Sequence, residues 1–183
     1  MAVVIDGTNG VSSPDYEVDG VTGQLYPIVS GTAVTASGTA VNFTSIPSWV
    51  KRITVLFSGV STSGTSAFLI QLGDSGGIEN TGYTGSGSNI GTGSTGITGS
   101  TAGFILVAAA VAANNYQGKV EINLADASTN TWVSFGTLSR SSNDSISSSA
   151  GTKSLSDTLT QVRITTVNGT DTFDAGTINI LYE

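Results

Sequence analysis

Four segments of the chain alternate between apolar and polar side chains. In residues 118–125, GKVEINLA, every second side chain from Val120 to Leu124 is apolar, and the residues between them are charged or carry an amide. Because successive side chains of a β-strand point to opposite faces, this pattern predicts strands covered mainly on one side. The four predicted strands are 50–57, 118–125, 161–167 and 176–182. Their predicted inward residues are Ile53, Val55, Phe57, Val120, Ile122, Leu124, Val162, Ile164, Ile178, Ile180 and Tyr182.

Four further segments have more continuous apolar runs: 39–44, 66–72, 102–109 and 131–138. Such runs are typical of strands buried on both faces or placed at a subunit contact. A helical turn in the alanine-rich residues 107–113 is the alternative for part of the third segment. With these, the chain has about eight predicted strands.

The predicted fold is all-β, because Gly or β-branched residues interrupt nearly every window long enough for a stable helix. Short strands punctuated by Gly, Asn and Asp, with no helical crossovers, favour two packed antiparallel sheets. We therefore expect an antiparallel β-sandwich, jelly-roll-like, over residues 39–183.

Two segments do not resemble sandwich strands. Residues 1–38 hold two of the three prolines, four acids and no Lys or Arg, which predicts an extended N-terminal arm. Residues 73–103 are dominated by Gly, Ser and Thr and are too long for an ordinary connection. They are interpreted as an exposed functional loop, a disordered loop or weak edge strands.

Composition removes several classes of function. The chain of 183 residues has no Cys and no His, which excludes disulfides, thiol nucleophiles and imidazole chemistry. Its net charge of −7 argues against nucleic acid as a partner. The longest apolar run, 104–113, is half the roughly 20 residues that a membrane-spanning helix needs. We expect a protein that is soluble, not inserted in a membrane, and not exported through a signal peptide, since the N-terminus lacks a basic region.

The acids are the only candidate catalytic groups, and no spacing pairs them as a glycosidase would require. We therefore predict no enzyme activity and no cofactor. The acids considered are Glu121, Asp126, Asp144, Asp157, Asp171 and Asp174.

One acidic stretch, NGTDTFDAG, is a weak candidate for calcium through Asn168, Asp171 and Asp174. The favoured interpretation is an Asn-Gly turn between the last two strands.

Aromatic residues outside the regular strands are candidates for a sugar-binding platform, because a flat ring with a polar tip suits a partly wet carbohydrate. Tyr83 and Tyr116 are the two predicted ligand-binding residues. Trp49 and Trp132 are interpreted as core or subunit-interface residues.

From about Thr39 onward the chain resembles a domain that recurs at the C-terminal end of bacteriophage tail fibre and related virion proteins. The resemblance rests on VNFTSIPSWVKRITVLFSGVSTSGTS (41–66) and VRITTVNGTDTFDAGTINILYE (162–183). It implies a virion structural protein, commonly trimeric, that an N-terminal part attaches to the particle. We accordingly expect a homotrimer located on the phage tail or capsid surface, with residues 1–38 bound to other phage tail or capsid proteins.

In such a trimer the apolar run that begins at Phe104 would lie against the same segment of neighbouring subunits. Phe104, Leu106 and Trp132 are the predicted interface residues.

Three functions follow from this interpretation. The first is a tail fibre or short tail appendage that binds host-surface glycan. The second is a capsid decoration or head-fibre protein with no receptor role. The third is a glycan depolymerase that uses two of the acids.

Overall fold

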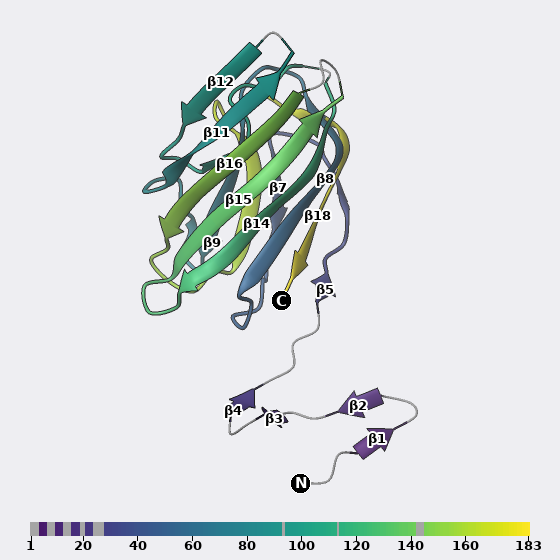
Figure 1. The fold of residues 1–183 in the computed structure, drawn as a ribbon, viewed down its shortest axis with the longest axis vertical. Helices are drawn as coiled ribbons and strands as arrows, with labels where there is room; N and C mark the ends of the chain where they lie inside the picture. Colours follow the sequence, from purple (N-terminus) through teal and green to yellow (C-terminus); the bar gives the residue numbers. More distant parts are fainter. Residues whose placement is uncertain are drawn as a thin grey trace.

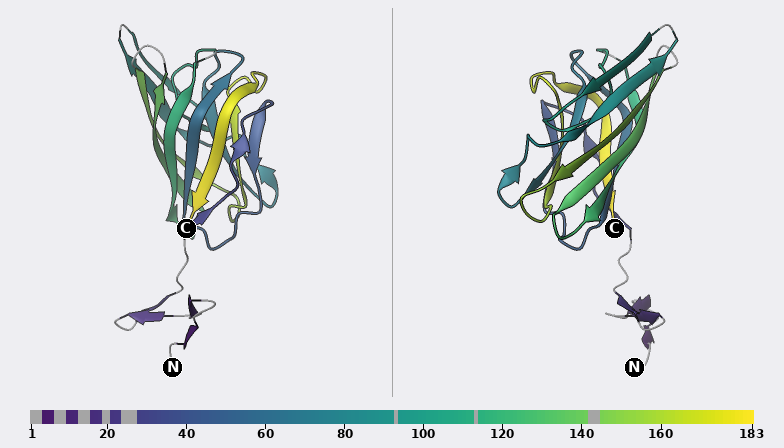
Figure 2. Two further views of the ribbon diagram at one scale, coloured as in Figure 1. Left: turned by 90° about the vertical axis from the view of Figure 1, so that its right-hand side faces the viewer. Right: turned by 60° about the vertical axis from the view of Figure 1, so that its left-hand side comes forward.

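The computed structural model describes residues 28–92, 94–112, 114–141 and 145–183, together with the backbone of four short strands that precede them. These early strands form two antiparallel pairs, β1 (Val4–Asp6) with β2 (Gly10–Ser12) and β3 (Tyr16–Val18) with β4 (Val21–Gly23). From residue 28 onward, two antiparallel sheets pack face to face (Figures 1 and 2), and the described residues form no helix. The predicted all-β sandwich is therefore confirmed.

The larger sheet has the strand order β12-β11-β16-β15-β14-β8-β18-β5, and β6 also pairs with β18. Three of its strands, β14 to β16, form a meander, and β8 lies between β14 and β18. The bounds are β5 (Val29–Ser30), β6 (Val34–Thr35), β8 (Arg52–Thr62), β11 (Thr84–Gly91), β12 (Ser94–Gly99), β14 (Tyr116–Asp126), β15 (Thr131–Arg140), β16 (Ser145–Ser154) and β18 (Phe173–Tyr182).

The smaller sheet has the order β10-β9-β17-β7, and β13 pairs with β9. Its strands are β7 (Ala40–Phe43), β9 (Phe68–Asp74), β10 (Gly77–Ile78), β13 (Phe104–Ile105) and β17 (Gln161–Thr166). The chain crosses repeatedly from one sheet to the other, as in a jelly roll, so strands distant in sequence become neighbours.

The alternating patterns identify the core correctly. Ile53, Val55, Val120, Ile122 and the other predicted inward residues are buried, except Leu124 and Tyr182, which pack partly exposed against the core. Every residue of β9 is buried, as its continuous apolar run predicts. Strand β15 differs from its prediction, because it alternates between buried and exposed positions instead of being covered on both faces.

The predicted boundary between arm and sandwich at residue 38 is misplaced. Strands β5 and β6 both pair with β18, and Ala36 is buried in the core. Gly38 bridges to Phe173. Residues 29–38 therefore belong to the sandwich, because their backbone continues the large sheet beyond its C-terminal strand.

The glycine-rich stretch 73–103 contains edge strands, which was the third of the three interpretations. Strand β11 pairs with β16 on one side and with β12 on the other. A side chain at Gly87 would approach the backbone carbonyl oxygen of Ile105 to 2.9 Å. Glycine is required at this inner position because the backbone of the following segment lies directly on the strand.

The alanine-rich segment is neither the long strand predicted for 102–109 nor a helical turn. Only Phe104–Ile105 is a strand, and the described residues that follow are irregular. The Asn89 side chain fixes this segment by accepting a hydrogen bond from Ala108 N at 3.1 Å and donating one to Ala109 O at 2.9 Å. One amide on β11 thus supplies hydrogen bonds that a neighbouring strand would otherwise have provided.

Candidate functional site

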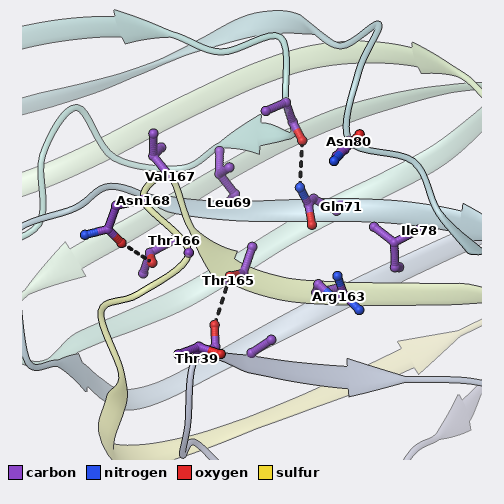
Figure 3. A pocket seen from close by; sticks show the side chains of 13 residues that line it. Thr39, Leu69, Gln71, Ile78, Asn80, Arg163, Thr165, Thr166, Val167 and Asn168 are labelled. Atoms are coloured by element: carbon purple, nitrogen blue, oxygen red, sulfur yellow. Dashed lines mark hydrogen bonds between the residues drawn. The ribbon is translucent and has the colours of Figure 1, made fainter.

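A groove of about 500 Å³ lies on the outer face of the small sheet. Its floor comes from strands β7, β9 and β17, and β10 and the turn after β17 form its sides (Figure 3). The lining residues are Thr39, Ala40, Leu69, Gln71, Ile78, Asn80, Ala102, Arg163, Thr165, Thr166, Val167, Asn168 and Gly169. We call it the polar groove.

Strand alternation places the polar side chains in the groove. On β17, Val162 and Ile164 are buried against the large sheet, so Arg163 and Thr165 point away from the core. Arg163 lies opposite Gln71 on β9 and opposite Asn42 on β7. An amide, a guanidinium and a second amide therefore form one row across three strands.

Hydrogen bonds hold these side chains in place. Arg163 Nε donates to Asn42 Oδ1 at 2.9 Å, and Gln71 Nε2 donates to Ala102 O at 2.9 Å. The Thr165 hydroxyl donates to Thr39 O at 2.9 Å (Figure 3). Gln71 and Thr165 are buried and Arg163 is partly exposed, so the hydrogen bonds limit the side-chain entropy that these residues would lose on binding a ligand.

The groove contains no acid, although the chain as a whole is strongly acidic. Within the part of the chain that the structure describes, Arg163 forms no ion pair. The guanidinium is thus the one formal charge among the lining residues. It favours ligands with hydroxyl, carboxylate or phosphate oxygens.

The calcium candidates lie in and beside the connection between β17 and β18, which belong to different sheets, and side chains stabilise the turn in this connection. Asn168 Oδ1 accepts bonds from the Thr166 hydroxyl at 2.9 Å and from Thr170 N and Asp171 N, both at 3.1 Å. Gly169 has a φ of 66°, which suits an Asn-Gly turn. This stretch therefore contains the Asn-Gly turn between the last two strands that the sequence predicts.

The two carboxylates of the same stretch bond to protein groups. Asp171 accepts from Asn168 Nδ2 at 2.7 Å and Ser66 N at 2.9 Å, and these bonds hold its pKa below the ordinary value. Asp174 accepts from the Ser61 hydroxyl. In the described part of the chain, His, Cys, Asp and Glu side chains nowhere gather in groups of three that would suit a metal ion.

The prediction that Tyr83 and Tyr116 form an exposed sugar platform is wrong. Both are almost completely buried, with 2% and 1% of their surface exposed. The Tyr83 hydroxyl accepts a bond from Leu72 N at 2.6 Å, and the Tyr116 hydroxyl accepts one from Val111 N at 3.0 Å. Their polar tips bond to backbone groups inside the sandwich instead of meeting a ligand.

The predicted interface residues are also core residues. Phe104, Leu106 and Trp132 are 3%, 1% and 3% exposed within the single chain. The Phe104 ring packs edge-on against Tyr83, with centroids 5.0 Å apart. The apolar excess of this segment fills the interior between the sheets, so these side chains do not supply a contact between subunits.

The candidate catalytic acids make separate local interactions. Glu121 pairs with Lys119 at 2.6 Å, Asp126 bonds to Ser128 N at 2.8 Å, and Asp157 bonds to Thr158 N at 2.6 Å. Hydrogen bonds from Lys119 and from Ser128 lower the pKa of Glu121 and of Asp126 respectively, whereas a general acid requires a raised pKa. Asp144 lies outside the described residues.

The groove residues were missed from the sequence because no motif marks them. One signal was present: the alternation in 161–167 already places Arg163 on the outer face of its strand. Its row with Gln71 and Asn42 depends on pairings across about ninety and about one hundred and twenty residues.

Comparison with known proteins gives no further guide to this site. Within the described residues, no helix has the length and apolar character needed to cross a membrane. No family model, no curated protein and no solved structure matches this chain.

Proposed function

We propose that this chain is a structural protein of a bacteriophage virion, a tail fibre or short tail appendage, whose sandwich binds host-surface glycan in the polar groove. The protein works as a homotrimer on the particle surface, where three grooves multiply a weak affinity for each glycan. Binding, not catalysis, is its role.

The arrangement of the two phage-like segments supports the virion assignment. Segment 41–66 contains β7 and β8, and segment 162–183 contains β17 and β18. Strand β7 pairs with β17 in the small sheet, and β8 pairs with β18 in the large sheet. The two stretches that carry the resemblance thus form one contiguous unit spanning both layers, as expected if they derive from the same domain.

The chemistry of the polar groove supports glycan as the ligand, and this observation carries the binding proposal. Sugars present hydroxyl groups that need both donors and acceptors, and the exposed Asn80 amide and the partly exposed Arg163 guanidinium supply them in the groove. Ile78 adds an apolar patch for a sugar face. A groove with an orienting row of polar groups and little enclosure suits a chain-like ligand.

In this proposal, the residues before Ile28 bind the other phage tail or capsid proteins. The later part of the predicted arm, 29–38, is engaged with β18. The chain enters the sandwich next to β18, through β5. The sandwich would therefore point away from the part of the particle that holds the residues before Ile28.

The binding test compares two arginines on opposite faces of the sandwich. Arg163→Gln removes the groove's charge and the guanidinium donors, whereas Arg52→Gln breaks the surface ion pair with Glu183, away from the groove. The probe is polysaccharide extracted from the bacterial strain in which the phage grows, measured by surface plasmon resonance. We expect Arg163→Gln to weaken binding at least tenfold and Arg52→Gln to leave it unchanged.

Other results point to the alternative functions. Polysaccharide that does not bind the unaltered trimer, together with antibody labelling over the phage head in electron microscopy, would replace the proposal with a capsid decoration protein. Release of reducing sugar from the polysaccharide would replace it with a depolymerase. Label at the tail tip with groove-dependent binding is the expected outcome.

A further inference from the structure

Half of the outer face of the large sheet carries no charged side chain. The residues that point outward from β15, β16, β11 and the described part of β12 are Ser, Thr, Ala, Gly or large apolar residues. We call this the uncharged face. Its residues are Thr84, Ser86, Ser88, Ile90, Thr95, Ile97, Gly99, Thr131, Val133, Phe135, Thr137, Ser139, Ile146, Ser148, Ala150, Thr152 and Ser154.

Strand register brings apolar side chains together within this face. Ile90 lies directly opposite Ile146, and Phe135 lies opposite Ala150. Phe135 is 63% exposed and Ile97 80% exposed, although both types are normally buried. Large apolar groups exposed on a flat surface of small residues are typical of a contact with another protein.

The other half of the same surface has the opposite character. Outward residues of β14, β8 and the chain beyond β18 include Lys119, Glu121, Arg52 and Glu183, which pair with each other. Charges therefore stop at the boundary between β14 and β15. If the protein simply had few charged residues spread evenly, charged side chains would occur on both halves of this surface.

We propose that the uncharged face is the contact surface between copies of this chain, with one part of the face packing against a different part of the same face on the next copy, around a threefold rotation axis. The inference rests on the homotrimer proposed above and assigns its contact surface; it is independent of glycan binding. It also replaces Phe104, Leu106 and Trp132, which the core already uses.

Charge identifies a second copy as the partner. Each chain has a net charge of −7, so most pairs of its surfaces repel when two copies approach. The uncharged face avoids this repulsion and buries no ionised group on association. It offers a foreign partner no charge to complement, whereas identical faces match each other in flatness and in side-chain size.

The first test adds charge to the face. Phe135→Glu and Ile97→Glu each place a carboxylate at an outward position; the first lies opposite Glu121, so circular dichroism must first show that the variant keeps its β-structure. Ser58→Glu is the matched control, because Ser58 is exposed on β8 in the charged half. We expect light scattering on a size-exclusion column to show a multimer for the unaltered chain and for Ser58→Glu, and at least a tenfold weaker association for the other two variants.

The second test uses the absence of cysteine from the chain. Ser148→Cys lies near the middle of the uncharged face, and Ser58→Cys is again the control. Under mild oxidation, Ser148→Cys is expected to form a disulfide-linked dimer within the multimer, and Ser58→Cys is not. Circular dichroism checks that every variant keeps its β-structure.

Each outcome decides the inference. An unaltered chain that remains monomeric at all concentrations overturns both the face and the homotrimer. A multimer that is unaffected by Phe135→Glu and Ile97→Glu overturns the face alone and leaves the homotrimer. Polysaccharide binding measured on the same variants reports on the glycan proposal separately, because the groove lies on the other sheet.

Discussion

The two ends of the sandwich interior are built in different ways. Between β8, β14 and β9, buried side chains such as Ile53, Ile122 and Phe68 fill the space between the sheets. Beside β11 and β16, the inner positions are mostly Gly and Ser, and the backbone after Phe104 lies close against them. At the first end, large buried side chains separate the two sheets. At the second end, the backbone of the segment after Phe104 packs directly against the inner side of β11 and β16.

This difference shows that a glycine-rich segment can be as ordered as an apolar one. Gly87 and Gly151 leave room for neighbouring backbone and for the Phe104 ring. Buried Ser147 then donates a hydrogen bond to Asn89 Oδ1 at 2.7 Å, which fixes the chain at the glycine-rich end. Close packing and satisfied hydrogen bonds provide order where large side chains are absent.

The largest effect is expected at the end packed by side chains. Ile122→Ala removes a completely buried side chain from β14 and should lower the free energy of unfolding by about 2–5 kcal/mol. Ile28→Ala is the control, because Ile28 is 64% exposed, and should change it by less than about 0.5 kcal/mol. Urea denaturation followed by tryptophan fluorescence measures both. Equal losses would contradict the assignment of this end as the main core.

At the glycine-rich end the expected defect is overpacking. Gly87→Val places a side chain within 2.9 Å of Ile105 O and 3.2 Å of the Leu106 carbonyl carbon. We expect a loss of about 1–3 kcal/mol in the free energy of unfolding, although valine is favoured in strands. Ser86→Val, at an exposed position on the same strand, should be neutral or slightly stabilising. If Gly87→Val is equally well tolerated in urea denaturation, the two ends do not differ as described.

The smallest expected effect concerns the ion pair that joins the two ends. Lys153 on β16 is buried, contacts Glu79 beyond β10, and lies 5.4 Å from the centre of the Tyr83 ring. Burial works against the charged form of Glu79, but hydrogen bonds from Lys153 and Ser156 outweigh it and hold the pKa of Glu79 below its ordinary value.

A lowered pKa means that folding favours the carboxylate. This stabilisation is complete above the ordinary glutamate pKa of about 4.3 and is lost as the pH falls through the lowered value. The urea midpoint of the unaltered chain should therefore fall between about pH 5 and pH 3, and Glu79→Gln should fall less steeply over that range. An identical pH profile for the two proteins would show that the pair does not join the ends.

The sequence predicts the strands whose inner side chains are large and misses strands whose inner side chains are small. Alternation identifies strands whose inner side chains are large, as on β8, β14, β17 and β18. Strand β16, SISSSAGTKS, has small inner residues and one buried lysine, so its alternation is invisible to hydrophobicity. The burial of Tyr83 and Tyr116 depends on packing against rings that lie further away in the sequence, Phe104 and Phe68 respectively.

The candidate site follows the same division. The outward direction of Arg163 could be predicted from its own strand, because Val162 and Ile164 point inward. Its row with Gln71 and Asn42 could not, since strand order in a sandwich is set by long-range pairing. The uncharged face likewise depends on the register of β11 with β16, which places Ile90 against Ile146.

The pairing of β8 with β18 also determines when the sandwich can complete its folding during synthesis. Ile53 lies opposite Tyr182, so the β8 side of the large sheet stays incomplete until the ribosome has released the chain as far as β18. Until then β8 exposes an apolar face and an unpaired edge, a state that favours aggregation or premature contact with other nascent copies. We therefore expect the sandwich to fold only after Tyr182 has left the ribosome, and slowly, because its contacts join distant parts of the sequence.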